Sequence, residues 1–200
     1  SGSTLTDLGQ DKETGRPSTV ASVGERVFYS GVRSNLIGGD NESVKYTGMV
    51  FFSKVVNTIN DLHKCYQEAD PTSRKISDLV DTDGGHINIS ECDNIIKLVP
   101  FQSSILVFAE NGIWEIKGSD RGFLATEYIV NKVSDVGCVN KDSIVNVEGV
   151  ICYWTESSIN IITRDKVGST AVESISDNKI DSLITSIDNN IIVGQYDRIN

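Results

Sequence analysis

One segment of this chain occurs twice, and this repeat constrains the fold more than any other feature of the sequence. Residues 105–116 (ILVFAENGIWEI) recur about 46 positions later as residues 151–162 (ICYWTESSINII). Each copy is an apolar run, a polar pair and a second apolar run, which predicts a β-hairpin. Asn111-Gly112 is a strong hairpin signal, because a type I′ turn needs positive φ at both central residues. A repeat of roughly 40–50 residues is typical of β-propellers and related arrays.

Related patterns extend the repeat in both directions. They are 142–149 (DSIVNVEG), 181–193 (DSLITSIDNNIIV) and, near the N-terminus, 19–30 (TVASVGERVFYS). We therefore predict an all-β, β-propeller-like fold with about three four-stranded antiparallel blades plus a partial one. The expected blades are about 19–92, 93–131 and 142–176, with the start of another at 181–200, all within a partial propeller domain of residues 19–200. Residues 1–18 are polar and without periodicity, so we expect a flexible lead-in.

The expected strands are short and separated by turn residues. They lie near 19–30, 49–53, 95–98, 105–109, 113–116, 126–130, 143–147, 150–155, 159–163 and 171–175. From about 57 to 86 the pattern weakens, and residues 31–48 contain a loop rich in glycine and asparagine. The sequence therefore defines the second and third blades better than the first.

The charge balance bears on possible partners. The chain has 28 acidic and 18 basic residues, a formal net charge of −10. This argues against a surface that grips nucleic acid, because such binding depends on Lys and Arg displacing counterions from phosphates. Nucleic acid could still slide past such a surface. No stretch approaches about 18 uninterrupted apolar residues, so we expect no membrane-spanning segment.

The candidate metal and thiol residues lack the spacing that their chemistry needs. Cys65, Cys92, Cys138 and Cys152 form no CxxC pair, and Cys152 is expected to be a core residue of its strand. Asp81-Thr82-Asp83-Gly84 faintly resembles a calcium loop, but the later acidic ligands of an EF-hand are missing, so a tight turn is the better interpretation.

Candidate catalytic residues are equally isolated. His63 beside Cys65 lacks a geometry that would let a base activate a thiol, and His86 is the other histidine of the chain. Glu110 and Glu156 could be compared with a glycosidase pair, but they occupy equivalent positions in two repeats, which favours a structural role. We therefore predict no catalytic, cofactor-binding or metal-binding residue, no cofactor, and a protein that is not an enzyme.

Two further features have ordinary structural interpretations. Ser119-Asp120-Arg121-Gly122 is only superficially similar to the Asp-box turn of sialidases, because the closing tryptophan is missing. Trp114 and Trp154 lie on the repeated hairpins, where we expect aromatic side chains to pack between blades rather than to stack on a sugar.

Seven segments, in order along the chain, resemble the tail nozzle proteins of short-tailed bacteriophages, also called tail tubular protein B. They are 26–31 (RVFYSG), 50–54 (VFFSK), 65–73 (CYQEADPTS), 79–85 (LVDTDGG), 98–114 (LVPFQSSILVFAENGIW), 133–138 (VSDVGC) and 153–157 (YWTES). The resemblance covers about residues 16–164. Members of that family run to several hundred residues with platform domains, so the resemblance implies a piece of the propeller region.

The resemblance implies a virion component, made in the bacterial host cytoplasm and located in the phage tail. In that family six copies form a distal tube through which the genome is ejected, and adaptor and fibre proteins attach around it. The expected partners are therefore other copies of the chain, other tail proteins, and passing double-stranded DNA that is not bound sequence-specifically. Acidic walls would suit such a conduit, because Lys and Arg contacts to phosphates would retain the DNA.

Two other functions remain open from the sequence alone. The chain could be a binding module that presents loops such as 31–48 and 57–90 to a glycan or protein on a host surface. A propeller glycosidase or sialidase is a weaker alternative, with Glu110 and Glu156 as the residues to test.

Overall fold

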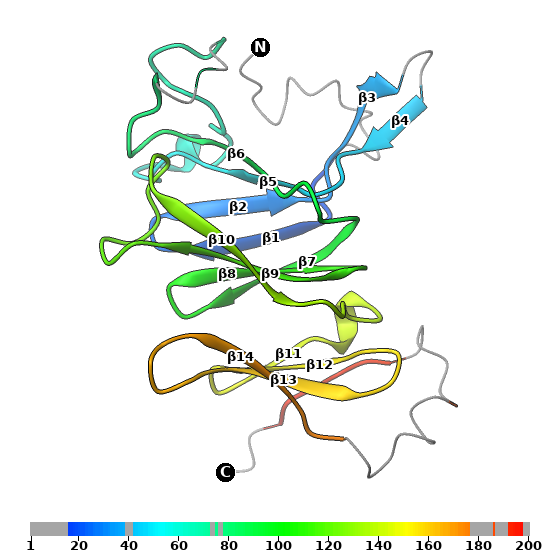
Figure 1. The fold of residues 1–200 in the computed structure, drawn as a ribbon. Coiled ribbons are helices and arrows are strands. Elements are labelled where there is room, and N and C mark those ends of the chain that lie inside the picture. The colour runs from blue at the N-terminus through cyan, green and yellow to red at the C-terminus, as the bar shows by residue number, and fades with distance from the viewer. Residues whose placement is uncertain are drawn as a thin grey trace.

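The computed structural model describes residues 16–38, 42–72, 75, 78–176, 186 and 192–197. These residues form three four-stranded antiparallel sheets and a separate two-stranded hairpin, without an α-helix (Figure 1). The predicted all-β fold with about three four-stranded blades is therefore confirmed. Most of the predicted lead-in and most of the predicted further blade at 181–200 lie outside the described residues.

The strands of each sheet follow one another closely in the chain. The first sheet contains β1 (Thr19–Val23), β2 (Arg26–Ser30), β5 (Met49–Phe52) and β6 (Gly85–Asn88). The second contains β7 (Ile95–Phe101), β8 (Ser104–Ala109), β9 (Gly112–Gly118) and β10 (Tyr128–Ser134). The third contains β11 (Val145–Val147), β12 (Val150–Trp154), β13 (Ile159–Arg164) and β14 (Thr170–Ser174). The 3-10 helices η1 (Ile59–Asp61) and η3 (Lys141–Ser143) lie in connections between strands.

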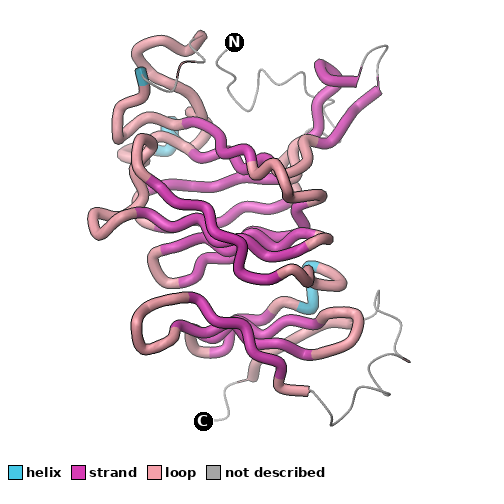
Figure 2. The backbone as a smooth tube through the Cα atoms, in the orientation of Figure 1, coloured by secondary structure: helices cyan, strands magenta, loops and turns pink. Residues whose placement is uncertain are grey.

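All three sheets are antiparallel meanders in which each strand pairs with the next strand of its sheet. The first sheet departs from this plan by two long connections. The hairpin of β3 (Arg33–Gly38) and β4 (Glu42–Lys45) projects from the body between β2 and β5, and residues 53–84 connect β5 to β6 (Figures 1 and 2). We call residues 53–84 the insertion.

The repeat seen in the sequence is kept in the register of the hydrogen-bonded pairs. In the second and third sheets, equivalent partners differ by the same 46 residues: Ile105–Ile116 with Ile151–Ile162, Leu106–Glu115 with Cys152–Ile161, Val107–Trp114 with Tyr153–Asn160, and Phe108–Ile113 with Trp154–Ile159. Because side chains alternate between the two faces of a strand, equivalent positions in these sheets point the same way.

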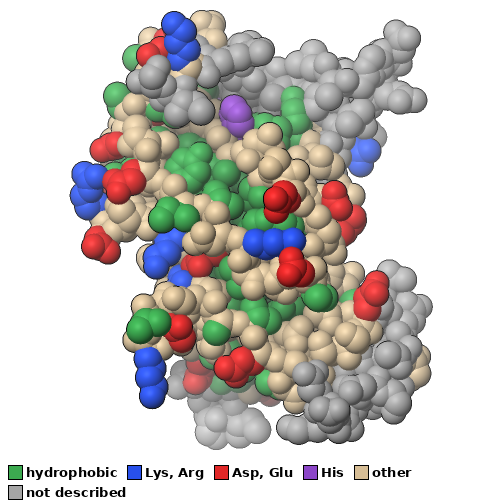
Figure 3. All heavy atoms as spheres, in the orientation of Figure 1, with side chains coloured by type: hydrophobic (Ala, Val, Ile, Leu, Met, Phe, Trp, Pro, Cys, Tyr) green, Lys and Arg blue, Asp and Glu red, His purple; other side chains and the backbone are tan. Residues whose placement is uncertain are grey.

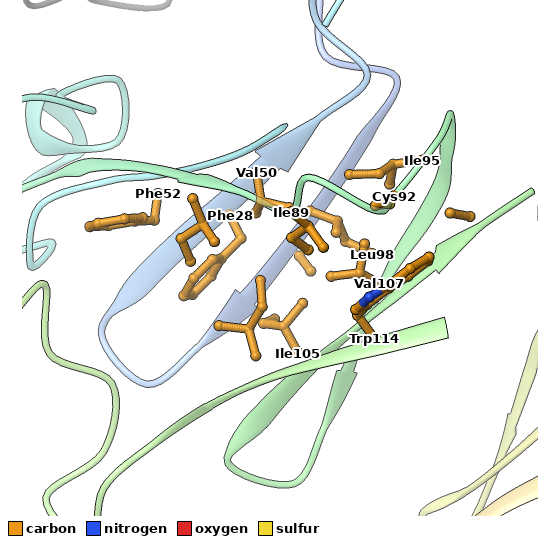
Figure 4. Close-up of a cluster of buried hydrophobic side chains, with 14 of the residues drawn as sticks. Phe28, Val50, Phe52, Ile89, Cys92, Ile95, Leu98, Ile105, Val107 and Trp114 are labelled. Atoms are coloured by element: carbon orange, nitrogen blue, oxygen red, sulfur yellow. The ribbon is translucent and has the colours of Figure 1, made fainter. Parts of the chain in front are cut away.

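The first and second sheets are stacked with an apolar core rich in aromatic residues between them. Figure 4 shows Phe28 and Phe52 of the first sheet with Ile105, Val107 and Trp114 of the second in one cluster. Phe123, from the connection between β9 and β10, packs its ring edge-on against Phe28 at 5.1 Å between centroids. The sheets also share a buried hydrogen bond, in which the Leu98 amide donates to Thr19 Oγ1 at 2.8 Å.

The second and third sheets are stacked through the opposite face of the second sheet. Leu106, Phe108 and Ile113 of the second sheet are fully buried against Ile151 and other residues of the third. The Phe108 and Tyr153 rings meet edge-on, with 5.3 Å between their centroids. The second sheet is therefore apolar on both faces, as expected for a strand set enclosed between two layers.

The structure corrects three expectations from the sequence. Residues 19–30 form a hairpin rather than one strand, because Gly24 adopts a φ of +59° between β1 and β2. The loop predicted at 31–48 contains β3 and β4, and β6 lies where the pattern was weak. Cys152, predicted as a core residue, is only half-buried because it points away from the second sheet.

Candidate interaction site

The predicted calcium-like turn is a structural turn that uses its own carboxylates. Asp83 accepts hydrogen bonds from the amides of Val80 and Glu68, each at 3.1 Å. Asp81 Oδ1 accepts a hydrogen bond from the Thr126 hydroxyl. The described part of the chain contains no group of three or more His, Cys, Asp or Glu side chains placed to hold a metal ion.

The structure does not bring the histidines and Cys65 together as a catalytic pair. His63 is exposed, whereas Cys65 is buried, and burial raises the pKa of its thiol to about 12. His86 lies on the outer face of the first sheet, where its ring centroid is 6.3 Å from that of Phe51. The described cysteines are all free thiols.

Glu110 and Glu156 occupy equivalent turns in the second and third sheets, as the repeat predicted. The Glu110 carboxylate accepts hydrogen bonds from Asn94 Nδ2 at 3.2 and 3.3 Å, across the turn that precedes β7. Glu156 is exposed at the β12–β13 turn, where Thr155 Oγ1 accepts from the Ser158 amide at 3.0 Å. Glu110 thus joins two connections at one end of the stack.

The turn at residues 119–122 and the two tryptophans also have structural surroundings. The Gly122 amide donates to the Ser119 carbonyl at 2.9 Å, and Arg121 forms a 2.8 Å ion pair with Glu127. Trp114 is buried between the first two sheets, with Lys132 Nζ 5.2 Å from its ring centroid. Trp154 is half-buried, on the face of the third sheet that points away from the second.

The most elaborate local structure is the insertion, which is fixed to the first sheet by Arg26. The guanidinium donates to the carbonyls of Ser53 at 2.6 Å and Asp83 at 2.5 Å, at the two ends of the insertion, and also to the Asp81 carbonyl. It lies between the rings of Phe52 and Phe123, at 5.6 and 5.5 Å from their centroids. One side chain of β2 therefore holds both ends of a 32-residue connection together.

Burial lowers the pKa of Arg26 to about 10, although the nearby carboxylates of Asp83 and Asp81 oppose the shift. Arg26 therefore stays protonated at neutral pH. A buried guanidinium needs its donors paired, and here most of the partners are backbone carbonyls. Arg26, which we call the anchor, thus fixes the backbone path of the insertion rather than the position of one of its side chains.

The insertion also packs against part of the outer face of the first sheet. Cys65 packs with Phe51 and Val32 in a small buried cluster, and Tyr29 donates its hydroxyl to the Leu62 carbonyl at 2.8 Å. Gly84 passes so close to the chain that a Cβ there would lie 2.1 Å from the Lys64 carbonyl oxygen. Only glycine fits at that crossing.

Ion pairs and a cap tighten the surface of the insertion. Lys64 contacts Asp61 at 3.1 Å and Glu68 at 3.3 Å, and Lys54 also pairs with Glu68. The hydrogen bond from Lys64 and those from Thr58 lower the pKa of Asp61 to about 2. Asp61 therefore remains ionised and caps η1 throughout the physiological range.

The surface of the insertion presents apolar side chains to solvent. Ile59 is 80% exposed and Val80 is 55% exposed. Val80 lines a shallow depression together with Leu79, Asp81, Thr82 and Thr126. We take the insertion with this depression as the candidate interaction site. The sequence predicted loops in this region but missed Arg26, because its carbonyl partners leave no residue-type signal.

A second arginine, which is largely buried, joins the second and third sheets. Arg164 at the end of β13 forms a 2.5 Å ion pair with Glu115 of β9 and donates to Ser104 Oγ at 2.9 Å. The Thr170 hydroxyl donates to the other Glu115 oxygen at 2.6 Å. Burial would raise the pKa of Glu115, but its hydrogen bonds with Ser104, Thr170 and Arg164 outweigh burial and lower it below its ordinary value.

The face seen in Figure 3 carries basic and acidic side chains interspersed among neutral ones, rather than a continuous basic patch. Within the described residues, no helix has the length and apolar character needed to cross a membrane. Comparison with protein-family models finds no match, and comparison with curated proteins finds none either.

Proposed function

We propose that this chain is a structural part of a bacteriophage tail nozzle, contributing stacked β-sheets to the wall of the channel through which the viral genome leaves. The support is the resemblance of seven ordered segments to tail nozzle proteins, together with where those segments lie in the fold. Five of them coincide at least in part with strands of the three sheets, and the other two, 65–73 and 79–85, lie in the insertion apart from Gly85.

The observation that carries the proposal is this coincidence. Segment 26–31 is β2 with Arg26, segment 50–54 is β5, and segment 98–114 runs from β7 into β9. Segment 79–85 supplies the carbonyls that Arg26 binds. A resemblance due to chance composition would have no reason to fall on the anchor and on both faces of the central sheet.

Such a component would act through rigidity. Sheets stacked through apolar cores, an insertion fixed at both ends and an ion pair between sheets would give a wall that holds its shape when DNA moves past it. The net charge of −10 supports the same role, since a wall poor in free cations retains phosphates weakly.

The direct test is electron microscopy of the full-length protein encoded by the gene that contains this sequence. We expect six-fold rings, and gold-labelled antibodies against residues 16–176 should bind phage particles at the distal end of the tail. A full-length protein that stays monomeric at high concentration, or that is absent from purified particles, would refute the proposal.

A second function, recognition of a host surface, is favoured by the anchored insertion. The insertion, which Arg26 holds in place, presents Ile59 and Val80 to solvent. Because this surface is already ordered, it would lose little conformational entropy on binding. The test is binding of the chain to host cells and to a glycan array. Val80→Asp should abolish binding, while Val167→Asp, at a still more exposed valine of the third sheet, should leave it unchanged.

A further inference from the structure

The third sheet has one face that the described residues leave only half-buried. By the 46-residue register, the second-sheet residues Leu106, Phe108 and Ile113 correspond to Cys152, Trp154 and Ile159. The former are fully buried against the third sheet. The latter are also apolar, yet they are only half-buried on the far face of the third sheet. The far face thus repeats the composition of an established interface.

A described segment of the chain lies at one edge of this far face. Residues 192–196 follow β11 from its beginning to its end (Figure 1). Asn140 Nδ2 donates to the Ile192 carbonyl at 3.2 Å, and the Gly194 amide donates to the Asp142 carbonyl at 2.8 Å. At the other end, the Tyr196 hydroxyl donates to Glu148 at 3.2 Å. The segment therefore runs beside β11 and in the same direction.

The segment lies close to β11 and buries its first residue. Ile192 is buried, whereas its neighbour Val193 is 75% exposed. A Cβ at Gly194 would lie 2.2 Å from Val145 Cγ2, so the segment approaches β11 as closely as a glycine allows.

We propose that the far face of the third sheet docks a fourth four-stranded sheet of the same polypeptide, with residues 192–196 as its innermost strand. β1 and β7 give the precedent, since they are the first strands of two stacked sheets and are joined by the Leu98–Thr19 hydrogen bond. The inference does not depend on the proposed function.

The same polypeptide is the consistent source, since residues 192–196 are already seated on the face and each sheet of the stack follows its predecessor in the chain. Such sheets need their neighbours, because one repeat unit cannot bury both of its apolar faces alone.

The test is the rate at which thiols react with a maleimide in the full-length gene product and, in parallel, in residues 1–200. Cys138, buried between the second and third sheets, is the internal reference. We expect Cys152 to be as slow as Cys138 in the full-length protein and at least about 100-fold faster in residues 1–200, because removing the docked sheet removes its protection.

The seating of residues 192–196 is tested by Gly194→Val, with Val167→Ala as the matched control in an exposed turn of the third sheet. In the full-length protein, Gly194→Val should raise the rate at which Cys152 reacts with maleimide at least tenfold. The reaction rate of Cys92, which lies between the first two sheets, should stay unchanged. Val167→Ala should change neither rate. The comparison of the two wild-type lengths needs no variant, so misfolding of Gly194→Val does not remove the test.

Several outcomes would overturn the proposal. Cys152 reacting much faster than Cys138 in the full-length protein would mean that the face is open. Full protection in residues 1–200 would mean that this chain covers the face itself. Protection that depends on protein concentration would assign it to a second copy, and a gene that encodes no further strands after Asn200 would exclude a fourth sheet.

Discussion

The contact between the first and second sheets differs from the contact between the second and third in one respect. Both bury apolar side chains, but the first is a cluster with aromatic rings such as Phe28 and Phe52, and no described residues form an ion pair across it. The second contains the Glu115–Arg164 pair, whose side chains are 5% and 11% exposed. Apolar packing and the Leu98–Thr19 hydrogen bond hold the first contact, and the second contact also depends on a charge pair.

This difference shows that two properties of the stack have separate sources: how strongly two sheets bind each other, and which sheets can pair. Apolar area stabilises any close pairing of sheets, whereas a buried charge is tolerated only where its partner is present. The contact with the ion pair should therefore be the one that responds to pH and to single charge removals. The following experiments test that distinction, from the largest expected effect to the smallest.

Removing an aromatic ring should damage the first contact most. Phe28→Ala deletes a ring that contacts Phe52 and Phe123, and leaves a cavity between the sheets. We expect the free energy of unfolding to fall by about 3–5 kcal/mol. Urea titration followed by tryptophan fluorescence measures the loss. Val20→Ala, at a 55% exposed position of the same sheet, is the control and should change it by less than about 0.5 kcal/mol.

Removing one member of the ion pair should damage the second contact. Glu115→Leu leaves the Arg164 guanidinium buried without its carboxylate, which should cost about 3 kcal/mol of unfolding free energy. The double variant Glu115→Leu with Arg164→Met removes both charges, and should recover to within about 1 kcal/mol of the wild type. Equal losses in the single and double variants would show that packing, not the unpaired charge, explains the effect.

Thiol labelling can localise these losses, because each contact contains one buried cysteine. Cys92 lies in the first contact and Cys138 in the second, and burial raises the pKa of each thiol to about 12. Glu115→Leu should speed the labelling of Cys138 about tenfold or more and leave Cys92 near its wild-type rate. Phe28→Ala should give the reverse. Equal acceleration of both thiols would mean that the stack opens only as a whole.

Acid should weaken the second contact selectively, with the smallest effect of the four. The pKa of Glu115 is lowered in the folded state, so its contribution to stability is present above its unfolded value, about 4.3, and is lost as pH falls through the folded value. The stability difference between wild type and Glu115→Gln should therefore shrink below about pH 4.3. The difference between wild type and Phe28→Ala should stay constant over the same range, as urea titrations at stepped pH would show.

The predictable part of the fold is the part with regular local signals. The hairpins β8–β9 and β12–β13 follow from alternating apolar residues around a turn, and Asn111-Gly112 marks the first of them. In contrast, β6 contains Ile87 as its single large aliphatic residue, so no alternation could reveal it. Its place is set by pairing with β5, which is a tertiary effect.

The candidate interaction site was predictable only as a region. Residues 57–90 could be identified as loops, because their periodicity is weak and Gly84-Gly85 follows an aspartate. The anchor could not be identified, because Arg26 lies in an alternating strand where a charged residue is normally exposed. Its partners are backbone carbonyls about 27 and 57 residues away, which only the folded chain brings together.

The ion pair between the second and third sheets is absent from the repeat itself. By the shared register, Glu115 corresponds to Ile161 and Arg164 to Gly118. Units of such similar sequence are prone to exchange places during folding, which traps repeat proteins in misassembled states. A third sheet that docked in the wrong order would leave Arg164 buried beside an aliphatic side chain. We therefore expect the pair to favour the native order of the sheets over misassembled ones.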